Sequence, residues 1–288
     1  MSEVLGEAVW TRRRDEHRDR VAGLIGPYLD RRRHGSSHPV VDFLFTYYRL
    51  RPAQLARWHP GFGVGLAGLE AVVYSRLSGY RRTNGIVTVD PDLLSRRCAT
   101  VEFVVGLLDS TARRPAHFGC FGLHEWAMVY RTEDLRHDVP LRLGRAGTDT
   151  VVESMPLRCT HFDAFRFFTS PARARNSAQL SRDMQRATEQ PGCLHAAMDL
   201  YKWCFKLLPL LDSAIVLDAF ELAYVARELD MRASPYDLTA LGYRPICIET
   251  RSGRAEYVRE QDAIAARAAT LRQELLLRCR TLLDAARG

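Results

Sequence analysis

Apolar residues recur at helical spacing in several long segments of this chain, and this periodicity constrains its fold more than any other feature. Proline, glycine and serine lie between many of these segments, as expected where helices end. The segments predicted to be helical are residues 12–33, 91–108, 177–189, 194–208, 209–229 and 260–286. Because helices outweigh strands by roughly three to one on these patterns, we predict a mainly α (α+β) fold.

Strand patterns occur in two places. Residues 150–157 alternate apolar and polar side chains and predict a strand. Residues 245–250 and 254–258 flank a short Arg-Ser-Gly connection, which is typical of a hairpin. No linker rich in proline, glycine and serine divides the chain. We therefore expect a single helical domain, residues 1–288, with a small antiparallel sheet or hairpin.

The first predicted helix is dense in charge. Residues 12–33 contain runs of arginine, while Val21, Ile25 and Tyr28 recur at helical spacing on one face. We expect residues 1–35 to form a basic amphipathic N-terminal helix that packs on the domain.

The hydropathy of the chain predicts no membrane partner. Its most apolar stretch, residues 207–226, is interrupted by Asp212, Asp218 and Glu221. It therefore lacks the roughly 20 uninterrupted apolar residues that a spanning helix needs. The first residues show no basic segment before an apolar run, so we expect a cytoplasmic protein.

Composition restricts the chemistry of the cysteines and of the basic residues. The seven cysteines are odd in number and never form a Cys-x-x-Cys pair, which argues against a disulfide framework and a structural zinc site. Only Lys202 and Lys206 are lysines among 41 basic residues, a bias typical of a GC-rich coding sequence. The formal net charge of +7 therefore does not by itself predict nucleic-acid binding.

Histidines and carboxylates gather in apolar or aromatic surroundings, which suggests a common site. On a helix His195 and Asp199 would face the same way, and on a strand His161 and Asp163 would share a face. The histidines in such surroundings are His38, His59, His124, His161 and His195, and the neighbouring acids are Glu125, Asp163, Glu189 and Asp199.

A metal centre is one use of such a cluster. His124, His161 and His195, together with a carboxylate, offer the nitrogen and oxygen ligands that iron, zinc or manganese accept. No His-Glu-x-x-His motif is present. A metal-dependent enzyme that acts on a small molecule, with iron or zinc as cofactor, is therefore the alternative hypothesis.

Hydrolysis of an N-glycosidic bond is a second use, and it needs no cofactor. A buried carboxylate would stabilise the oxocarbenium-like transition state, and aromatic faces would hold the departing base. We rank the candidate carboxylates in the order Asp199, Asp163, Glu125. The candidate aromatic residues are Tyr47, Tyr48, Trp58, Trp126 and Tyr201, and the arginines that would hold phosphates include Arg49, Arg51, Arg166 and Arg232.

Two further groups bear on catalysis. Lys202 follows Asp199 by three residues, so it would pair with that carboxylate or supply an amine that attacks the sugar carbon. Cys193 and His195 lie two apart, a spacing that does not bring side chains together on a helix. A Cys/His dyad from these two residues is therefore not expected.

Several long blocks resemble a known family. The strings HPVVDFLFTYYRLRPAQLARWHPGFG, RPAHFGCFGLHEWAMVYR, CTHFDAFRFF, EQPGCLHAAMDLYKW and LDMRASPYDL are similar to an actinobacterial family commonly named 3-methyladenine DNA glycosylase. The resemblance extends from about residue 20 to the end, and it implies removal of an alkylated purine from duplex DNA. It assigns no catalytic residue, because the Leu-Pro-Gly-x-Gly hairpin of helix-hairpin-helix glycosylases is absent.

The sequence thus supports a leading hypothesis and two alternatives. The leading one is a DNA glycosylase active in base-excision repair, with DNA as its partner. The alternatives are the metal-dependent small-molecule enzyme and a nucleic-acid-binding protein without enzymatic activity.

Overall fold

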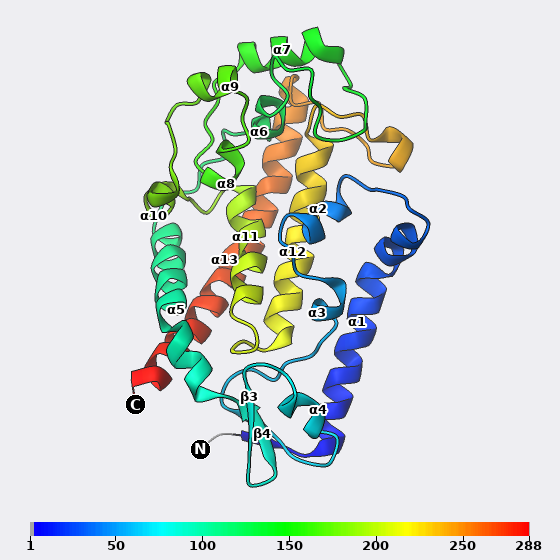
Figure 1. Cartoon of the computed structure of the whole chain (residues 1–288). Coiled ribbons are helices and arrows are strands. Elements are labelled where there is room, and N and C mark those ends of the chain that lie inside the picture. The colour runs from blue at the N-terminus through cyan, green and yellow to red at the C-terminus, as the bar shows by residue number, and fades with distance from the viewer. Residues whose placement is uncertain (1–2, 288) are drawn as a thin grey trace. The chain divides into compact units, whose positions relative to one another are not determined.

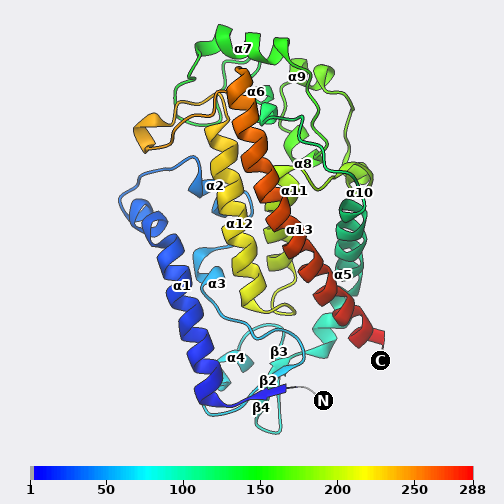
Figure 2. The ribbon, with the colours of Figure 1, turned by 180° about the vertical axis from the view of Figure 1, so that it is seen from behind.

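The computed structural model describes residues 3–287, and it is mainly α, as predicted. Helices make up 59% of the chain. Figure 1 shows the arrangement of the elements and Figure 2 shows it from behind. The long helices are α1 (Glu7–Arg33), α5 (Pro91–Ala112), α11 (Leu194–Lys206), α12 (Ser213–Arg232) and α13 (Arg251–Arg287).

Local sequence signals explain where these helices begin. Pro91 occupies the first position of α5, where its missing N–H costs no helical hydrogen bond. The Asp212 carboxylate accepts hydrogen bonds from the backbone N–H groups of Ala214 and Ile215, so it caps α12. The predicted helix over residues 177–189 is present only in part, as η1 (Arg182–Met184) and α10 (Gln185–Thr188).

The remaining helices are short and connect the long ones. They are α2 (Val41–Thr46), α3 (Pro52–Leu55), α4 (Val72–Ser75), α6 (Leu123–Ala127), α7 (Gly144–Ser154), α8 (Phe162–Phe165), α9 (Ser170–Arg175) and the 3₁₀ turn η2 (Thr239–Leu241).

A small four-stranded sheet lies beside α4 and the start of α1 (Figures 1 and 2). Its strands are β1 (Glu3–Leu5), β2 (Val64–Leu66), β3 (Tyr80–Thr83) and β4 (Ile86–Val89), in the order β1-β2-β4-β3. β1 and β2 run parallel, and the other pairs are antiparallel. Asn84 and Gly85 connect β3 to β4 with positive φ angles of 50° and 81°, as the tight turn of a hairpin requires.

The strand predicted over residues 150–157 is wrong, because this segment belongs largely to helix α7. Its buried residues are Thr148, Val151 and Val152, which recur at the i, i+3, i+4 spacing of a helical face. The strand geometry expected for His161 and Asp163 is therefore also wrong. His161 instead precedes the first residue of α8, and Asp163 lies within that helix.

The hairpin predicted over residues 245–258 is also wrong, because Arg251 begins α13. The Thr250 hydroxyl accepts a hydrogen bond from the backbone N–H of Gly253 at 3.0 Å, as a helix-capping residue does. A side chain at Gly253 would collide with the carbonyl of Cys247. The Arg-Ser-Gly connection is thus the first turn of a helix.

The contacts of the chain define two compact units. Unit 1 contains Met1–Leu108, Leu200–Glu221 and Leu271–Gly288, and unit 2 contains Asp109–Asp199 and Leu222–Thr270. The expectation of one domain over residues 1–288 stays a prediction. The antiparallel part of the predicted small sheet is present, although at other residues than expected.

The N-terminal helix α1 packs within unit 1. The Trp10 indole donates a hydrogen bond to the carbonyl of Ala67, and its ring contacts the edge of Tyr74. Arg20 forms ion pairs with Asp218 and Glu221 at 2.8 Å each. These contacts attach α1 to the rest of unit 1 near its start, at Trp10, and further along, at Arg20.

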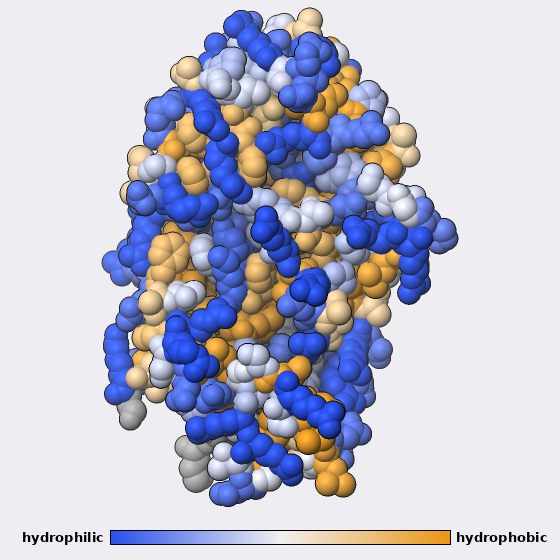
Figure 3. Space-filling view, in the orientation of Figure 1, coloured by the Kyte–Doolittle hydropathy of each residue, from blue (hydrophilic) through white to orange (hydrophobic). Residues whose placement is uncertain are grey.

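Hydrophilic and apolar side chains are interspersed over the face shown in Figure 3. Across residues 3–287, none of the helices has both the length and the apolar character needed to cross a membrane.

Candidate functional site

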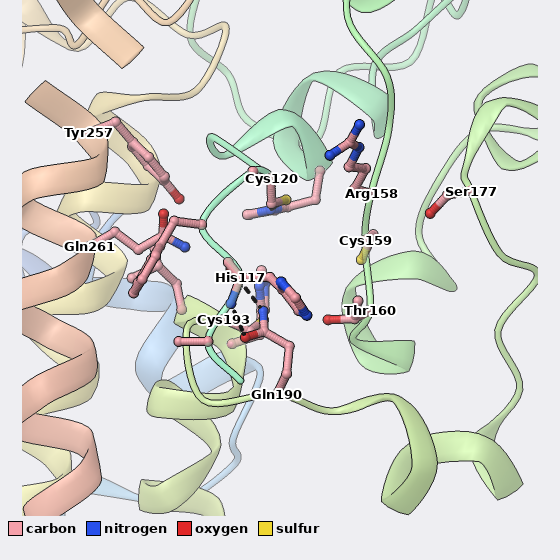
Figure 4. Close-up of a pocket in the computed structure, with 16 residues that line it drawn as sticks. His117, Cys120, Arg158, Cys159, Thr160, Ser177, Gln190, Cys193, Tyr257 and Gln261 are labelled. Carbon is pink, nitrogen blue, oxygen red and sulfur yellow. Dashed lines mark hydrogen bonds between the residues drawn. The ribbon is translucent and has the colours of Figure 1, made fainter. Parts of the chain in front are cut away.

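A cavity of about 470 Å³ lies within unit 2. Four segments supply most of its lining, namely residues 116–124, 158–160, 190–195 and 257–261. Figure 4 shows Cys120, Cys159 and Cys193 on different segments around it, with Tyr257 and Gln261 on α13. The volume is in the range of sites for small molecules.

Two buried glutamines hold the wall of this cavity. The Gln190 side-chain oxygen accepts hydrogen bonds from the backbone N–H groups of His117 and Gly192, and its amide nitrogen donates to the carbonyl of His117 (Figure 4). The Gln261 amide donates to the carbonyl of Gly192 at 2.6 Å. A side chain at Gly192 would crowd the backbone of His117, so glycine permits this close packing of two chain segments.

His124, His195 and Asp230 form a buried group at the cavity. His124 lies on α6, His195 in the first turn of α11 and Asp230 near the end of α12. One potential metal-ligating atom from each lies within 4.8 Å of the others. Both histidines also line the cavity, so the group is accessible from it.

His124 is held by an acid. Its Nε2 atom lies 2.6 Å from an oxygen of Asp230, and its Nδ1 atom lies 3.6 Å from the sulfur of Cys120. Burial lowers the pKa of His124, but the Asp230 carboxylate outweighs it and holds this pKa well above the usual value. Without a metal, His124 is therefore a buried imidazolium paired with a carboxylate.

His195 has the opposite electrostatic setting. Burial and the neighbouring His124 hold its pKa well below the usual value, so its imidazole is neutral. Its ring lies 4.4 Å from that of His124 and 5.4 Å from that of His161, between centroids. His195 is 8% exposed and lines the cavity. A neutral buried imidazole on a cavity wall is suited to bind a metal or accept a proton.

Arg227 pairs with two buried acids, Asp230 of this group and its neighbour Glu125. Its guanidinium lies 2.6 Å from Glu125 and 2.9 Å from Asp230, and all three side chains are almost fully buried. Burial raises the pKa of Glu125, but Arg227 and His124 outweigh it and lower this pKa to about 2. Glu125 is thus ionised and committed to an ion pair.

His161 lies between two further buried acids. Its Nε2 atom is 3.3 Å from Asp199 and 3.6 Å from Glu189. The ring of His195 contacts the rings of both His124 and His161. The three histidines that the metal hypothesis selects therefore lie together in the structure. The three-residue group with metal-ligand spacing, however, contains Asp230 in place of His161.

The carboxylates ranked for glycosidic hydrolysis are placed differently. Asp163 forms ion pairs with Arg182 at 3.1 Å and with Arg166 at 3.3 Å. Neither Asp163 nor Asp199 nor Glu125 is among the described residues that line the cavity. Their role in base excision stays a prediction.

The aromatic residues proposed to hold a base lie outside the cavity lining. Trp126 is buried in unit 2, where its indole donates a hydrogen bond to the carbonyl of Ala233. The other four belong to unit 1, and they are Tyr47, Tyr48, Trp58 and Tyr201. Tyr48 contacts the edges of Tyr47 and Tyr201.

The remaining candidates are basic residues. Arg232 forms ion pairs with Glu260 at 2.9 Å and with Glu256 at 3.6 Å. Lys202 lies in unit 1, with its ammonium 4.7 Å from the ring centroid of Trp203. Both cations thus have partners within their own unit.

Sequence reasoning missed Asp230, Arg227 and Gln261. Arg227 and Asp230 are three apart on one helix, and charged residues inside an apolar helical pattern were the available signal. A second signal was a repeated pairing of cysteine with histidine, because Cys120, Cys159 and Cys193 each precede one of the three histidines by two or four residues. All three cysteines line the cavity.

Comparison with known proteins gives no relative, since no family model, curated protein or solved structure matches the chain.

Proposed function

We propose that the protein is a metal-dependent enzyme that acts on a small molecule in the cavity of unit 2. The observation that carries this proposal is the buried group of His124, His195 and Asp230, two of which line the cavity. Two imidazoles and one carboxylate are ligands typical of iron, zinc and manganese sites. Hard cations such as calcium instead favour sites made only of oxygen ligands.

The chain supplies features that a metal site needs. Asp230 lies 2.6 Å from His124, so this contact already holds two of the three side chains together. His195 is neutral, which leaves a lone pair for a metal. A bound metal would polarise a substrate oxygen or lower the pKa of a bound water.

Metal analysis of the purified full-length protein tests this proposal. We expect stoichiometric zinc, iron or manganese, and we expect His195→Ala to lose it. His38→Gln is the matched control, because His38 is as buried as His195 but belongs to unit 1. Metal-free wild type, after reconstitution with each of these metals has failed, would overturn the proposal.

Base excision on DNA remains the competing hypothesis from the family resemblance. It predicts a metal-free protein that binds duplex DNA with strong salt dependence and releases alkylated purine. An excision assay on methylated duplex DNA separates the two, because the small-molecule enzyme should release no base. The Asp199→Asn, Asp163→Asn and Glu125→Gln variants then test the ranked carboxylates, since full excision by all three would exclude their proposed role.

A further inference from the structure

We propose that the cavity of unit 2 takes a small organic acid as its substrate, with the carboxylate of that acid bound by Arg158 and its carbon skeleton lying deeper in the cavity. This inference rests on the proposed function, because it names the substrate class of the same site. It makes Arg158 a specificity-determining residue, since Arg158 would select a charged substrate over a neutral one.

The charge of the cavity wall is the first observation. Among the described residues that line the cavity, Arg158 is the only arginine or lysine, and none is an aspartate or a glutamate. The buried acids Asp230 and Glu125 lie outside this lining, where both pair with Arg227. The lining therefore offers a cation to an anionic substrate and no carboxylate that would repel it.

One guanidinium matches one carboxylate in charge and in shape. Its planar set of N–H groups donates two parallel hydrogen bonds to the two oxygens of a carboxylate. A phosphate monoester also binds arginine, but it carries about 1.5 to 2 negative charges at pH 7. The single arginine in the described part of the lining therefore favours a carboxylate as the anionic group.

The backbone that carries Arg158 is fixed by a buried amide. The Asn176 side chain accepts a hydrogen bond from the backbone N–H of Cys159 at 2.8 Å and donates one to the carbonyl of the same residue at 3.1 Å. A Cβ atom placed on Gly119 would lie 3.8 Å from the Nη1 atom of Arg158, so the guanidinium lies close to the wall segment 116–124. Arg158 is thus held between two of the segments that line the cavity.

Exposure orders the cavity from its mouth to its interior. Arg158 is exposed, whereas His124 and His195 are buried, so the guanidinium lies at the open side and the histidines lie inside. The half-buried Phe118 and the buried Tyr257 also line the cavity, and Figure 4 shows Arg158 and Tyr257 on different walls. A substrate would keep its carboxylate near water and place an apolar skeleton against the aromatic rings, which limits the cost of burying the charge. Its carbon skeleton would then lie on the side of the histidines.

Matched pairs of small probes test this inference on the full-length protein. The carboxylates are benzoate, phenylacetate, 3-phenylpropionate and hexanoate, each compared with its own primary amide, and phenyl phosphate is the phosphate probe. Ligand-observed NMR measures the affinities. We expect at least one carboxylate to bind the wild type about 10-fold more tightly than its amide, because hydrogen bonds to a charged group are stronger than those between neutral groups.

Substitutions of the arginine test whether Arg158 is the group that binds the carboxylate. Arg158→Gln should remove the preference for carboxylates over amides without changing the metal content. Arg158→Lys should keep part of this preference, because it keeps the charge and loses the planar fork of donors. Arg259→Gln is the matched control, since Arg259 is an exposed arginine of unit 2 outside the cavity lining, and it should leave the preference unchanged.

Four results would overturn this inference. They are a wild type that binds no probe, a wild type that binds each amide as tightly as its acid, a carboxylate preference that survives in Arg158→Gln, and tighter binding of phenyl phosphate than of every carboxylate. With metal still bound to the wild type, each of these results would leave the proposed function standing. A metal-free wild type that shows a carboxylate preference dependent on Arg158 would instead count against the proposed function and leave the carboxylate site standing.

Discussion

The buried histidines of the two units differ in what they contact. In unit 1, His17 bonds the carbonyl of Leu55 at 2.9 Å, and His59 bonds the hydroxyl of Tyr80 at 2.8 Å. Burial lowers the pKa of both, for His59 to about 4. In unit 2, by contrast, His124 bonds a carboxylate that raises its pKa.

This difference shows why burial alone is a poor guide to function. A buried histidine that bonds only a neutral partner, as His17 and His59 do, is typical of a structural hydrogen bond. His124 and His195 lie beside each other with opposite pKa shifts. Pairs of titratable groups whose pKa values are pushed apart are typical of reactive sites.

The largest expected effect concerns the buried arginine of unit 2. Arg227→Met should lower the free energy of unfolding by about 3–5 kcal/mol, because it leaves Glu125 buried without its ion-pair partner and removes one of the two cations beside Asp230. Urea denaturation at neutral pH measures this change.

Arg20→Met is the matched control from unit 1. Arg20 also bridges two carboxylates, but its side chain is 44% exposed, and exposed ion pairs contribute at most about 1 kcal/mol. Similar losses of unfolding free energy in the two variants would mean that the buried ion pairs of Arg227 contribute no more to stability than an exposed ion pair.

The second effect is a pH dependence that arises in the same network. Because the pKa of Glu125 falls from 4.5 to about 2 in the folded protein, its ionisation stabilises the fold above pH 4.5. This contribution, about 3 kcal/mol, is lost as pH falls from 4.5 toward 2. Unfolding free energies between pH 6 and pH 2.5 should show that loss in the wild type.

Glu125→Gln should remove this part of the pH dependence, since glutamine does not titrate. Glu153→Gln, which changes an exposed partner of Arg131, should leave it in place. A wild type and a Glu125→Gln variant with parallel pH profiles would contradict the prediction.

The third effect concerns the hydrogen bond between His59 and Tyr80 in unit 1. Tyr80→Phe leaves the buried ring of His59 without its hydrogen bond, which should cost about 1–3 kcal/mol in unfolding free energy. Metal content should not change, because His59 belongs to the other unit. A Tyr80→Phe protein that kept its stability and lost its metal would reverse the roles assigned to the two sets of histidines.

The sequence predicted the long helices better than the strands, for a physical reason. Helices α5, α11 and α12 each bury a face that repeats every three to four residues, and that repeat is visible in the chain. In α7 the adjacent valines Val151 and Val152 look like part of a strand unless Thr148, one turn earlier, is counted with them. The hairpin of the structure lies at Asn84-Gly85, a dipeptide that is typical of a tight turn between two strands.

The site was predictable in its histidines and not in its acids. His124, His161 and His195 stand out in the sequence because they lie in apolar segments, and a polar ring that is buried with such a segment requires a polar partner. Asp230 lies 106 residues from His124, and only the packing of the folded chain pairs them. No spacing rule connects residues so far apart, so the choice among carboxylates depended on sequence neighbours instead.

The smallest expected effect concerns Lys202. Its ammonium lies 4.7 Å from the ring centroid of Trp203, a contact that an arginine also makes well. Lys202→Arg should therefore change the unfolding free energy by less than about 0.5 kcal/mol, and Lys202→Met should lose about 0.5–1 kcal/mol. The lysine matters chemically only if its amine attacks a sugar carbon, a role that arginine cannot take. Borohydride treatment with methylated duplex DNA tests that role directly. An adduct formed by the wild type and absent from Lys202→Arg would make Lys202 a nucleophile and favour base excision, whereas equal behaviour of the two proteins would leave it a packing residue over Trp203.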